Sequence, residues 1–393
     1  MSVVRTFYSA FFPYSIRARI SRLRYRATVS IWKARLTRGL KGKEQRHYEG
    51  KQVAIIGLFS TRSGVGRGAE LIARSIELKG GLVTRVDIPW RGLESIGNTA
   101  TSAVECEKRG SSISDLIVVA SPPVFFQALS MFSLEWLRQR TIVAHWVWEL
   151  DVVDRDWNDA VKICDEVWAS SEFVAQTLKP LCEARSVLLK VVPYPVDIDP
   201  FQPPGKEQKL NARRKFDIPE GAFVVGYSFA ASSNLPRKNP MGAVAAFQKA
   251  FPTDQNVILI IRALDGHVYR QGMMELERAA ARDPRIIVVE HSSDLPIADF
   301  YAAIDLYVSP ARSEGYGLNI VEATQAGRPV VAVEWSLSPD VLGRPGVVSA
   351  GYKLVPVTEG QGDYARVKGA RWADPYIDDM ARKIIAIRDA SAS

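Results

Sequence analysis

The feature that most constrains this chain is an alternation of short apolar runs with longer amphipathic segments. It begins at Gln52 and restarts at FVVGYSF, residues 223–229. Runs such as QVAIIGLF and DLIVVAS are typical of buried strands, whereas RGAELIARSIELKG has the three- and four-residue spacing of a helix. Because strands that alternate with helices form parallel sheets covered on both faces, the pattern predicts an α/β fold with two open domains.

The two halves are separated by a polar stretch with prolines, IDPFQPPGKEQKLNARRKF, which is interpreted as a linker. We expect domains at 51–197 and 198–375 and a final helix within 376–393, with packing against the first domain as one possible arrangement. In sheets of this kind ligands bind beyond the carboxyl ends of strands, where the strand order reverses. The expected site is therefore a cleft between two facing domains.

The first fifty residues differ in charge from the rest of the chain. They carry 12 Lys/Arg and 2 Glu, against 39 basic and 41 acidic residues in the other 343. One predicted helical face, flanked by arginines, carries Ile16, Ile20, Leu23, Ala27 and Ile31. Such a helix suits the surface of an anionic membrane. We expect residues 1–45 to bind the protein to the cytoplasmic face of that membrane. A helix packed on the body and an organellar transit peptide remain as alternatives.

Composition argues against several other classes. The body without this leader is near neutral, which disfavours nucleic-acid binding. No apolar run approaches the ~18 residues of a membrane-spanning helix. The three cysteines form no C-x-x-C pair and the four histidines are scattered, so we expect neither a disulfide framework nor a metal site.

SGVGRGA, residues 63–69, contains a glycine pattern with two interpretations. Gly64, Gly66 and Ala69 satisfy G-x-G-x-x-A, and Asp87 lies at the end of the next predicted strand, as in nicotinamide dinucleotide sites. However, residues 59–63 intervene between the first strand and Gly64. This longer loop favours a sugar or phosphate site at a helix N-terminus. A purely structural turn is the third possibility.

Asp154 and Asp156 form a D-x-D pair, which can hold a divalent metal against a diphosphate. They stand at the expected start of a helix. Aspartates in that position cap the helix and complement its dipole, and the capping interpretation is favoured.

LPRKNP follows the predicted strand FVVGYSF and places Arg237 and Lys238 on a loop before a helix. Two cations beside a helix N-terminus form a strong anion site, and an arginine can bind phosphate through two hydrogen bonds. An exposed charge pair is the alternative.

SEGYGLNIVEATQA places Glu314 in a loop after a strand and Glu322 about one turn into a helix. Gly315 and Gly317 let the backbone approach a ligand closely. Carboxylates would repel a phosphate but suit hydroxyl donors of a sugar or ribose. A helix cap with an exposed helical glutamate is the alternative.

The spacing of Glu314 and Glu322 resembles the E-x7-E motif of retaining glycosyltransferases of family 4, whose members adopt the GT-B fold of two facing Rossmann-like domains. HWVWELDVVDRDW and DEVWASSEFVAQTL are similar to a stretch of bacterial exopolysaccharide and lipopolysaccharide members. RKNPMGAVAAFQKAF resembles their phosphate-binding region, and YKLVPVTEG with RWADP resembles a tail segment. The resemblance extends over the whole chain apart from the leader.

The resemblance implies a role for each matching residue. Glu314 would hold hydroxyl groups of the donor sugar, and Glu322 would bind the nucleotide ribose. Arg237 and Lys238 would neutralise the diphosphate. Backbone contacts with the sugar and diphosphate would come from Gly315, Tyr316, Gly317 and Leu318. The acceptor side of the cleft would be lined by Gly64, Gly66, His145, Trp148 and Glu149.

We therefore expect a retaining, metal-independent transferase that needs no cofactor beyond its nucleotide-sugar donor. It would move a hexose to a lipid-linked or polysaccharide acceptor. The alternatives are an NAD-dependent oxidoreductase that uses Gly64, Gly66 and Asp87, and a non-catalytic sugar-nucleotide-binding protein.

Overall fold

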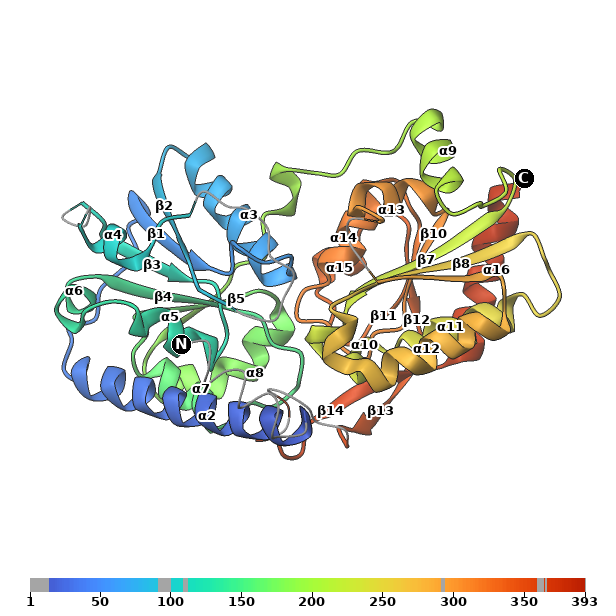
Figure 1. Ribbon diagram of the computed structural model, residues 1–393. Coiled ribbons are helices and arrows are strands. Elements are labelled where there is room, and N and C mark those ends of the chain that lie inside the picture. The colour runs from blue at the N-terminus through green and yellow to red at the C-terminus, as the bar shows by residue number, and fades with distance from the viewer. Residues whose placement is uncertain are drawn as a thin grey trace, which may run out of the picture.

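The computed structural model describes residues 14–90, 100–108, 112–290, 294–358, 364 and 366–392, with side chains from residue 23 to residue 391. Two α/β halves face each other (Figure 1). This confirms the predicted fold class. The calls on residues 1–13, and on the side chains of Ile16 and Ile20, lie outside the described part of the chain.

The first half is built on a six-stranded sheet in the order β2-β1-β3-β4-β5-β6, in which every neighbouring pair is parallel. Its strands are β1 (Gln52–Gly57), β2 (Leu82–Asp87), β3 (Asp115–Val118), β4 (Thr141–Trp146), β5 (Glu166–Ala169) and β6 (Leu188–Val191). Its helices are α3 (Gly64–Leu78), α4 (Ala103–Lys108), α5 (Val124–Ser130), α6 (Leu134–Arg138), α7 (Arg155–Val161) and α8 (Glu172–Glu183).

The second half repeats this design with the order β12-β11-β10-β7-β8-β9, again parallel throughout. Its strands are β7 (Phe223–Ala230), β8 (Val257–Leu264), β9 (Ile286–Val289), β10 (Leu306–Ser309), β11 (Val330–Val333) and β12 (Val347–Ala350). Its helices are α10 (Leu235–Lys238), α11 (Pro240–Ala250), α12 (Arg270–Arg282), α13 (Ile297–Ala303), α14 (Leu318–Gln325) and α15 (Pro339–Leu342). Short 3₁₀ turns lie at Val196–Ile198, Ala231–Ser233 and Gly266–Tyr269.

Strand β1 shows why the apolar runs carry no alternation. Val53 and Ile55 are buried in one hydrophobic cluster, and Ala54 and Ile56 in another. Successive strand residues point to opposite faces, so a sheet covered on both faces needs an apolar residue at every position.

The segment interpreted as a linker contains a helix, α9 (Lys206–Arg214), which was not predicted. Arg213 fixes this helix to the second half, because its guanidinium donates to the Ala303 carbonyl at 2.9 Å and to the Asp305 carboxylate at 2.6 Å. The polar composition of this segment gave no indication that one of its arginines is buried.

The tail of the chain contacts both halves. A β-hairpin, β13 (Tyr352–Pro356) with β14 (Arg371–Pro375), leads into α16 (Ile377–Ala392). Tyr364 and Trp372 are buried in the core of the first half. Helix α16 instead packs on the second half, where Arg388 pairs with Asp254 at 2.7 Å. The arrangement of the final helix against the first domain is therefore wrong, because helical spacing does not say which surface a helix will cover.

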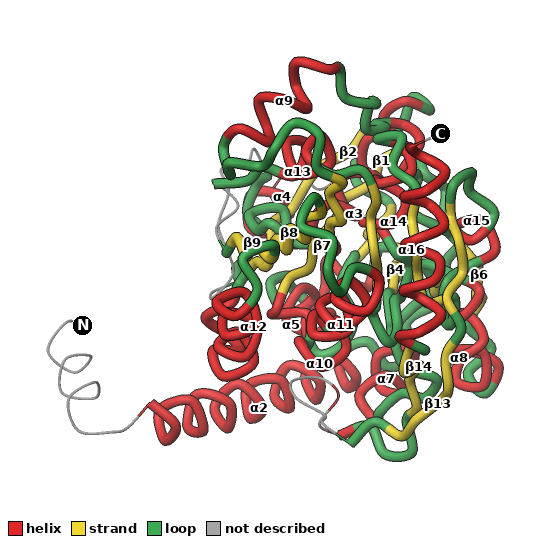
Figure 2. The backbone as a smooth tube through the Cα atoms, turned by 90° about the vertical axis from the view of Figure 1, so that its right-hand side faces the viewer, coloured by secondary structure: helices red, strands yellow, loops and turns green. Residues whose placement is uncertain are grey.

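The basic leader forms α2 (Tyr14–Gly39), which runs along the lower edge of the first half (Figures 1 and 2). Its inner face buries Val29 and Leu36. Lys33 pairs with Asp156 at 2.8 Å, and Arg35 donates to the Phe132 carbonyl at 2.8 Å. Among the described residues no helix combines the length and the apolar character needed to cross a bilayer.

Candidate functional site

The candidate site is a cavity of about 570 Å³ between the two halves, at the carboxyl ends of their strands. In the second half it lies beyond β7 and β10, between which the strand order reverses. This is where open α/β sheets bind ligands. Of the predicted site residues, the lining contains Gly64, Glu149, Arg237, Lys238, Glu314, Gly315, Tyr316, Gly317, Leu318 and Glu322.

The loop after β10 presents Glu314 and the start of α14. Gly317 is the N-cap of α14 and has a φ of +99°, a conformation that side-chain-bearing residues rarely adopt. Gly315 is required by close approach, since a Cβ atom there would lie 2.5 Å from Val147. The Gly315 carbonyl also accepts hydrogen bonds from Ser170 and Ser171 of the first half.

Arg237 and Lys238 are not on a loop, as the sequence suggested, but on the helical turn α10. The side chain of Asn234 accepts a hydrogen bond from the Arg237 amide at 3.1 Å and so caps this turn. Arg237 is only 2% exposed. Its guanidinium donates to the carbonyls of Ser313 (2.6 Å) and Ser233 (2.8 Å), so the exposed-pair alternative does not describe it.

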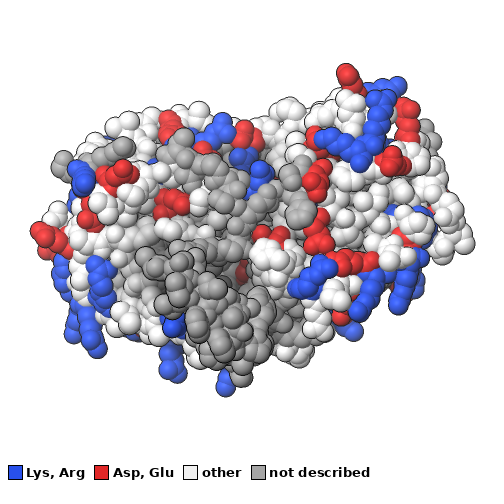
Figure 3. Space-filling model, viewed as in Figure 1, with Lys and Arg blue, Asp and Glu red and all other residues white. Residues whose placement is uncertain are grey.

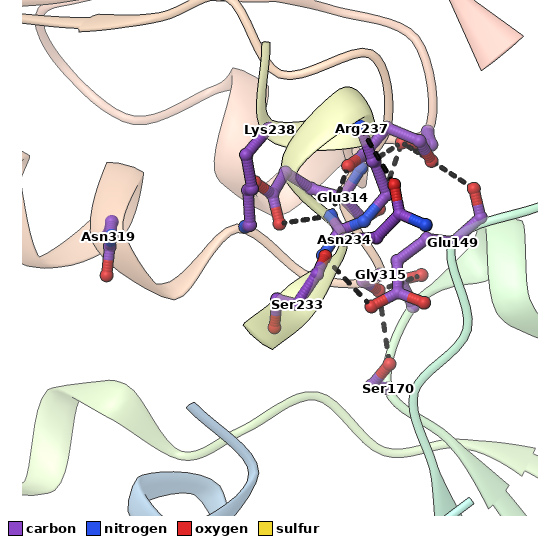
Figure 4. A network of polar contacts seen from close by, with 12 residues as sticks. Glu149, Ser170, Ser233, Asn234, Arg237, Lys238, Glu314, Gly315 and Asn319 are labelled. Atoms are coloured by element: carbon purple, nitrogen blue, oxygen red, sulfur yellow. Dashed lines mark hydrogen bonds and ion pairs between the residues drawn. The ribbon is translucent and has the colours of Figure 1, made fainter. Parts of the chain in front are cut away.

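Four charged side chains meet at this point and are called the charge cluster: Glu149, Arg237, Lys238 and Glu314 (Figure 4). Lys238 Nζ lies 2.6 Å from Glu314 Oε1, and Arg237 Nη1 lies 3.4 Å from Glu314 Oε2. Arg237 Nη2 lies 3.5 Å from Glu149 Oε1, which reaches across from the first half. Two cations and two carboxylates leave the cluster formally neutral.

Burial and pairing act in opposite directions on Glu314. Burial opposes its ionisation, but attraction to Lys238 and Arg237 outweighs that effect and holds the pKa of Glu314 below its usual value. Burial also lowers the pKa of Lys238, an effect that Glu314 partly offsets. Burial disfavours the Arg237 charge as well, yet Tyr364 and the two carboxylates raise its pKa.

Glu322 lies on the same wall in a different environment. Tyr301 Oη donates to Glu322 Oε2 at 3.1 Å, and the cation nearest to it, Arg67 of α3, has its Nε 3.9 Å away. Burial raises the pKa of Glu322 to about 7 because these partners compensate only in part.

The glycine loop of the first half forms the N-terminal turn of α3. Ser63 caps the helix by accepting from the Gly66 amide at 3.0 Å, and Gly64 faces the cavity. Gly66 is buried and does not line the cavity, which corrects its expected place. Asp87 accepts a hydrogen bond from the Ser60 amide at 2.8 Å and thereby holds the loop that precedes the helix.

Two further residues expected in the cleft are buried instead. His145 is on β4, where its Nε2 lies 2.8 Å from the Val192 carbonyl, and burial lowers its pKa to about 4. Trp148 is buried, and its Nε1 donates to the Val152 carbonyl at 2.8 Å. The alternation of side chains after β4 explains the position of Trp148, since Val147 and Glu149 on either side of it reach the cavity. His145 lies earlier, on β4 itself, and is buried there.

The D-x-D pair lies away from the cavity. Asp154 is the N-cap of α7 and accepts from the Asp156 amide at 2.8 Å, whereas Asp156 pairs with Lys33. The capping interpretation is confirmed. Among the described residues no group of three His, Cys, Asp or Glu side chains is arranged to hold a metal ion.

Several cavity residues carried no recognisable signal in the sequence. They include Arg62, Arg67, Tyr194, Asp199, Arg262 and Asn319. Arg67 lies within the glycine loop, directly after Gly66, and could have been suspected from that loop. The others come together only through the facing of the two halves.

Part of the chain is similar in sequence to known proteins. Residues 229–358 match the family model described as "Glycosyl transferases group 1". The O-antigen biosynthesis glycosyltransferase WclY of Escherichia coli is 25% identical over 126 residues, which cover 32% of this chain and 33% of that protein. The lipopolysaccharide core biosynthesis mannosyltransferase LpsB of Rhizobium meliloti (strain 1021) is 29% identical over 145 residues, which cover 37% of this chain and 40% of that protein. The match thus spans at most two fifths of these relatives' length.

Solved structures share the fold of most of the chain. A glycosyltransferase from Rickettsia africae ESF-5 superposes with a TM-score of 0.61 at 14% identity, over 88% of this chain and 90% of that one. Anabaena Alr3699/HepE, in complex with UDP and glucose, gives a TM-score of 0.55 at 17% identity, over 76% of this chain and 85% of that one. At these identities the likeness establishes the fold, GT-B.

Proposed function

We propose that this chain, which carries a Glycosyl transferases group 1 domain, transfers a hexose from a nucleotide-diphosphate sugar to a lipid-linked or polysaccharide acceptor. The charge cluster is the observation that carries the proposal. Two cations and the N-terminus of α14 face one cavity, and carboxylates stand beside them. This combination suits a molecule that has a diphosphate in its middle and hydroxyl groups on either side of it.

The diphosphate, the sugar and the ribose of the donor then each have a partner. Arg237, Lys238 and the amides at the start of α14 stabilise the charge that develops on the departing diphosphate. Glu314 accepts hydrogen bonds from the sugar, and Glu322 from the ribose. We further propose that the configuration is retained, with the acceptor oxygen joining the anomeric carbon on the face from which the diphosphate leaves.

Donor binding must reorganise the charge cluster. Glu314 lies 2.6 Å from Lys238 in the structure, so the diphosphate competes with this carboxylate for the cation. Displaced from Lys238, Glu314 is free to accept hydrogen bonds from the sugar. In the absence of substrate, the carboxylates of the cluster therefore neutralise the cations that the diphosphate neutralises when it binds. The buried cations are then never left without a counter-charge.

Metal independence is part of the proposal because side-chain cations occupy the position that a metal ion would otherwise take beside a diphosphate. We expect full activity in excess chelator, measured as nucleotide release after prolonged dialysis. Loss of activity that is restored by a divalent metal would contradict it. We also propose that the enzyme needs no cofactor beyond its nucleotide-sugar donor.

The principal experiment is a thermal-shift screen of UDP- and GDP-sugars, followed by transfer assays with the donor that binds. Glu314→Ala is expected to abolish transfer, and retained wild-type transfer would contradict the assignment. Nicotinamide fluorescence on titration would instead support the oxidoreductase alternative. Donor binding without transfer to any acceptor would support a non-catalytic binding protein.

We also propose that α2 holds the enzyme on the cytoplasmic membrane face, where lipid-linked acceptors lie. Its inner face packs on the first half, but Leu23 and Ile31 on its outer face are 61% and 66% exposed. No acidic residue occurs between residues 1 and 43. Lys and Arg side chains project from the lower edge of the molecule, along which α2 runs (Figures 1 and 3). An exposed apolar stripe with flanking cations suits an anionic bilayer.

Sedimentation with anionic and with neutral vesicles tests this placement. Leu23→Ser combined with Ile31→Ser should weaken binding to anionic vesicles severalfold without loss of folding, because neither side chain is buried. The matched control is Leu78→Ser with Leu82→Ser, two comparably exposed leucines on the α3 and β2 side. Equal effects of the two pairs, or equal binding to neutral vesicles, would contradict the proposal.

A further inference from the structure

Glu149 is the carboxylate that the first half contributes to the described lining of the cavity. It comes from the loop after β4 and crosses to the charge cluster of the second half (Figure 4). Its position there is fixed from three directions. Its Oε1 lies 3.5 Å from Arg237, its Oε2 accepts from Tyr364 Oη at 2.9 Å, and its carbonyl accepts from the Ser313 hydroxyl.

These contacts leave Glu149 capacity for a further ligand. Its side chain remains 19% exposed, and its pair with Arg237 is the longest of the three ion pairs in the cluster. A carboxylate can accept about four hydrogen bonds, more than these contacts use.

The position of Glu149 relative to Arg237 suggests what that ligand is. Arg237 touches Glu314 with one amino group and Glu149 with the other. A diphosphate bound to Arg237 would therefore lie within one guanidinium width of Glu149. In a reaction with retention the attacking hydroxyl approaches beside the departing diphosphate, which is the space that Glu149 faces.

We infer that Glu149 is a catalytic residue, the base that binds and deprotonates the attacking hydroxyl group. In this step the acceptor oxygen forms a bond to the anomeric carbon. The bond from that carbon to the diphosphate breaks, with its electron pair staying on the diphosphate. The acceptor proton moves to a carboxylate oxygen of Glu149. The inference rests on the proposed function and adds a role that Glu314, on the donor side, cannot fill.

Glu149→Gln tests the role with little change in shape. Water serves as the acceptor, and the rate of nucleotide release is measured from UDP-glucose or GDP-mannose, whichever the wild type hydrolyses. Loss of a positioned base is expected to lower the rate by about 100-fold or more. The dissociation constant for the same donor should change less than threefold.

Two further variants separate catalysis from a contact that merely joins the halves. Asp151→Asn is the matched control, since Asp151 is a loop carboxylate of the first half that pairs with Arg371 of β14 in the tail at 2.9 Å. It should leave the rate within twofold of the wild type. Tyr364→Phe keeps the carboxylate but removes one support of it, so its rate should fall less than that of Glu149→Gln.

The outcomes are decisive. The inference is overturned if Glu149→Gln keeps more than a tenth of the wild-type rate, if Asp151→Asn loses as much, or if donor affinity falls in parallel with the rate. That last result would place Glu149 on a donor hydroxyl. If the wild type binds none of the UDP- and GDP-sugars in the screen, the proposed function fails first and this inference with it.

Discussion

Two regions of the same cavity wall, around Glu314 and around Glu322, hold carboxylates eight residues apart under opposite electrostatic conditions. Glu314 lies 2.6 Å from Lys238, and its pKa is held below the usual value. Glu322 has its nearest cation 3.9 Å away and a pKa of about 7. One motif thus contains a carboxylate that is ionised throughout the physiological range and one that titrates within it.

The difference follows from the elements that surround each residue. The end of β10 brings Glu314 next to α10, which supplies two cations. Glu322 is one turn into α14 and faces Tyr301, a hydroxyl donor without charge. A diphosphate needs the cations near Glu314, whereas a ribose needs acceptors alone. The contrast therefore fits the diphosphate and the ribose of a nucleotide sugar.

The largest expected effect comes from removing the cation that defines the Glu314 region. Lys238→Met leaves Glu314 without its nearest partner, and breaking such a buried pair costs about 3 kcal/mol or more. We expect that loss in the free energy of unfolding, measured in urea, and about a 1,000-fold fall in transfer. Lys215→Met, which breaks an exposed pair with Asp299 at 2.6 Å, should cost less than about 1 kcal/mol. Equal costs would remove the distinction between the regions.

The Glu322 region should respond to pH where the Glu314 region does not. If ribose hydroxyls donate to ionised Glu322, donor affinity should rise about tenfold between pH 6 and pH 8, since a group with a pKa of about 7 ionises over that range. Glu322→Gln should make the affinity flat with pH. A flat wild-type profile, measured by calorimetry, would exclude the ribose role.

The same titration has a consequence for stability. The folded state holds the Glu322 proton more tightly than the unfolded state, in which the carboxyl has the ordinary glutamate pKa of about 4.5. The free energy of unfolding should therefore fall as pH rises from that value through about 7, by up to about 3 kcal/mol. Glu322→Gln should remove this component, which shows as a smaller loss of melting temperature above pH 5.

A smaller effect is expected from the support of the Glu314 backbone. Ser336 Oγ accepts from the Glu314 amide at 2.8 Å and donates to the Glu314 carbonyl at 2.9 Å. Ser336→Ala should lower the free energy of unfolding by about 1–2 kcal/mol and weaken donor binding severalfold. Ser391→Ala, which removes an exposed hydroxyl contact on α16, should change neither quantity.

The smallest effect sharpens the Glu322 side of the comparison. Tyr301→Phe removes the hydrogen bond that favours the ionised carboxylate and so raises the pKa of Glu322 further. The midpoint of the pH-dependent donor affinity should move upward by less than one pH unit, in line with a hydrogen bond worth about 1 kcal/mol. A downward shift would show that Tyr301 stabilises the protonated form.

Much of the fold could be predicted because its signals are local. The buried strands β1 and β7 are continuous apolar runs, and the cap at Asp154 depends on residues two positions apart. Helix α9 was missed because its polar sequence has no apolar stripe, and α10 because a single turn has no period. His145 and Trp148 were assigned to the cleft because the resemblance places a segment and not the direction of each side chain.

By itself the sequence determined two parallel α/β halves, a separate basic leader, and the residues that gather at the ends of β7 and β10. These depend on periodicity and on residue type, which are local properties of the chain. Only the tertiary structure decided that Glu149 joins Arg237 from the opposite half, that α2 has both a docked and an exposed face, and that the two glutamates differ in charge state. Such features arise from distances between residues far apart in the chain, and electrostatic energies depend on those distances and on burial.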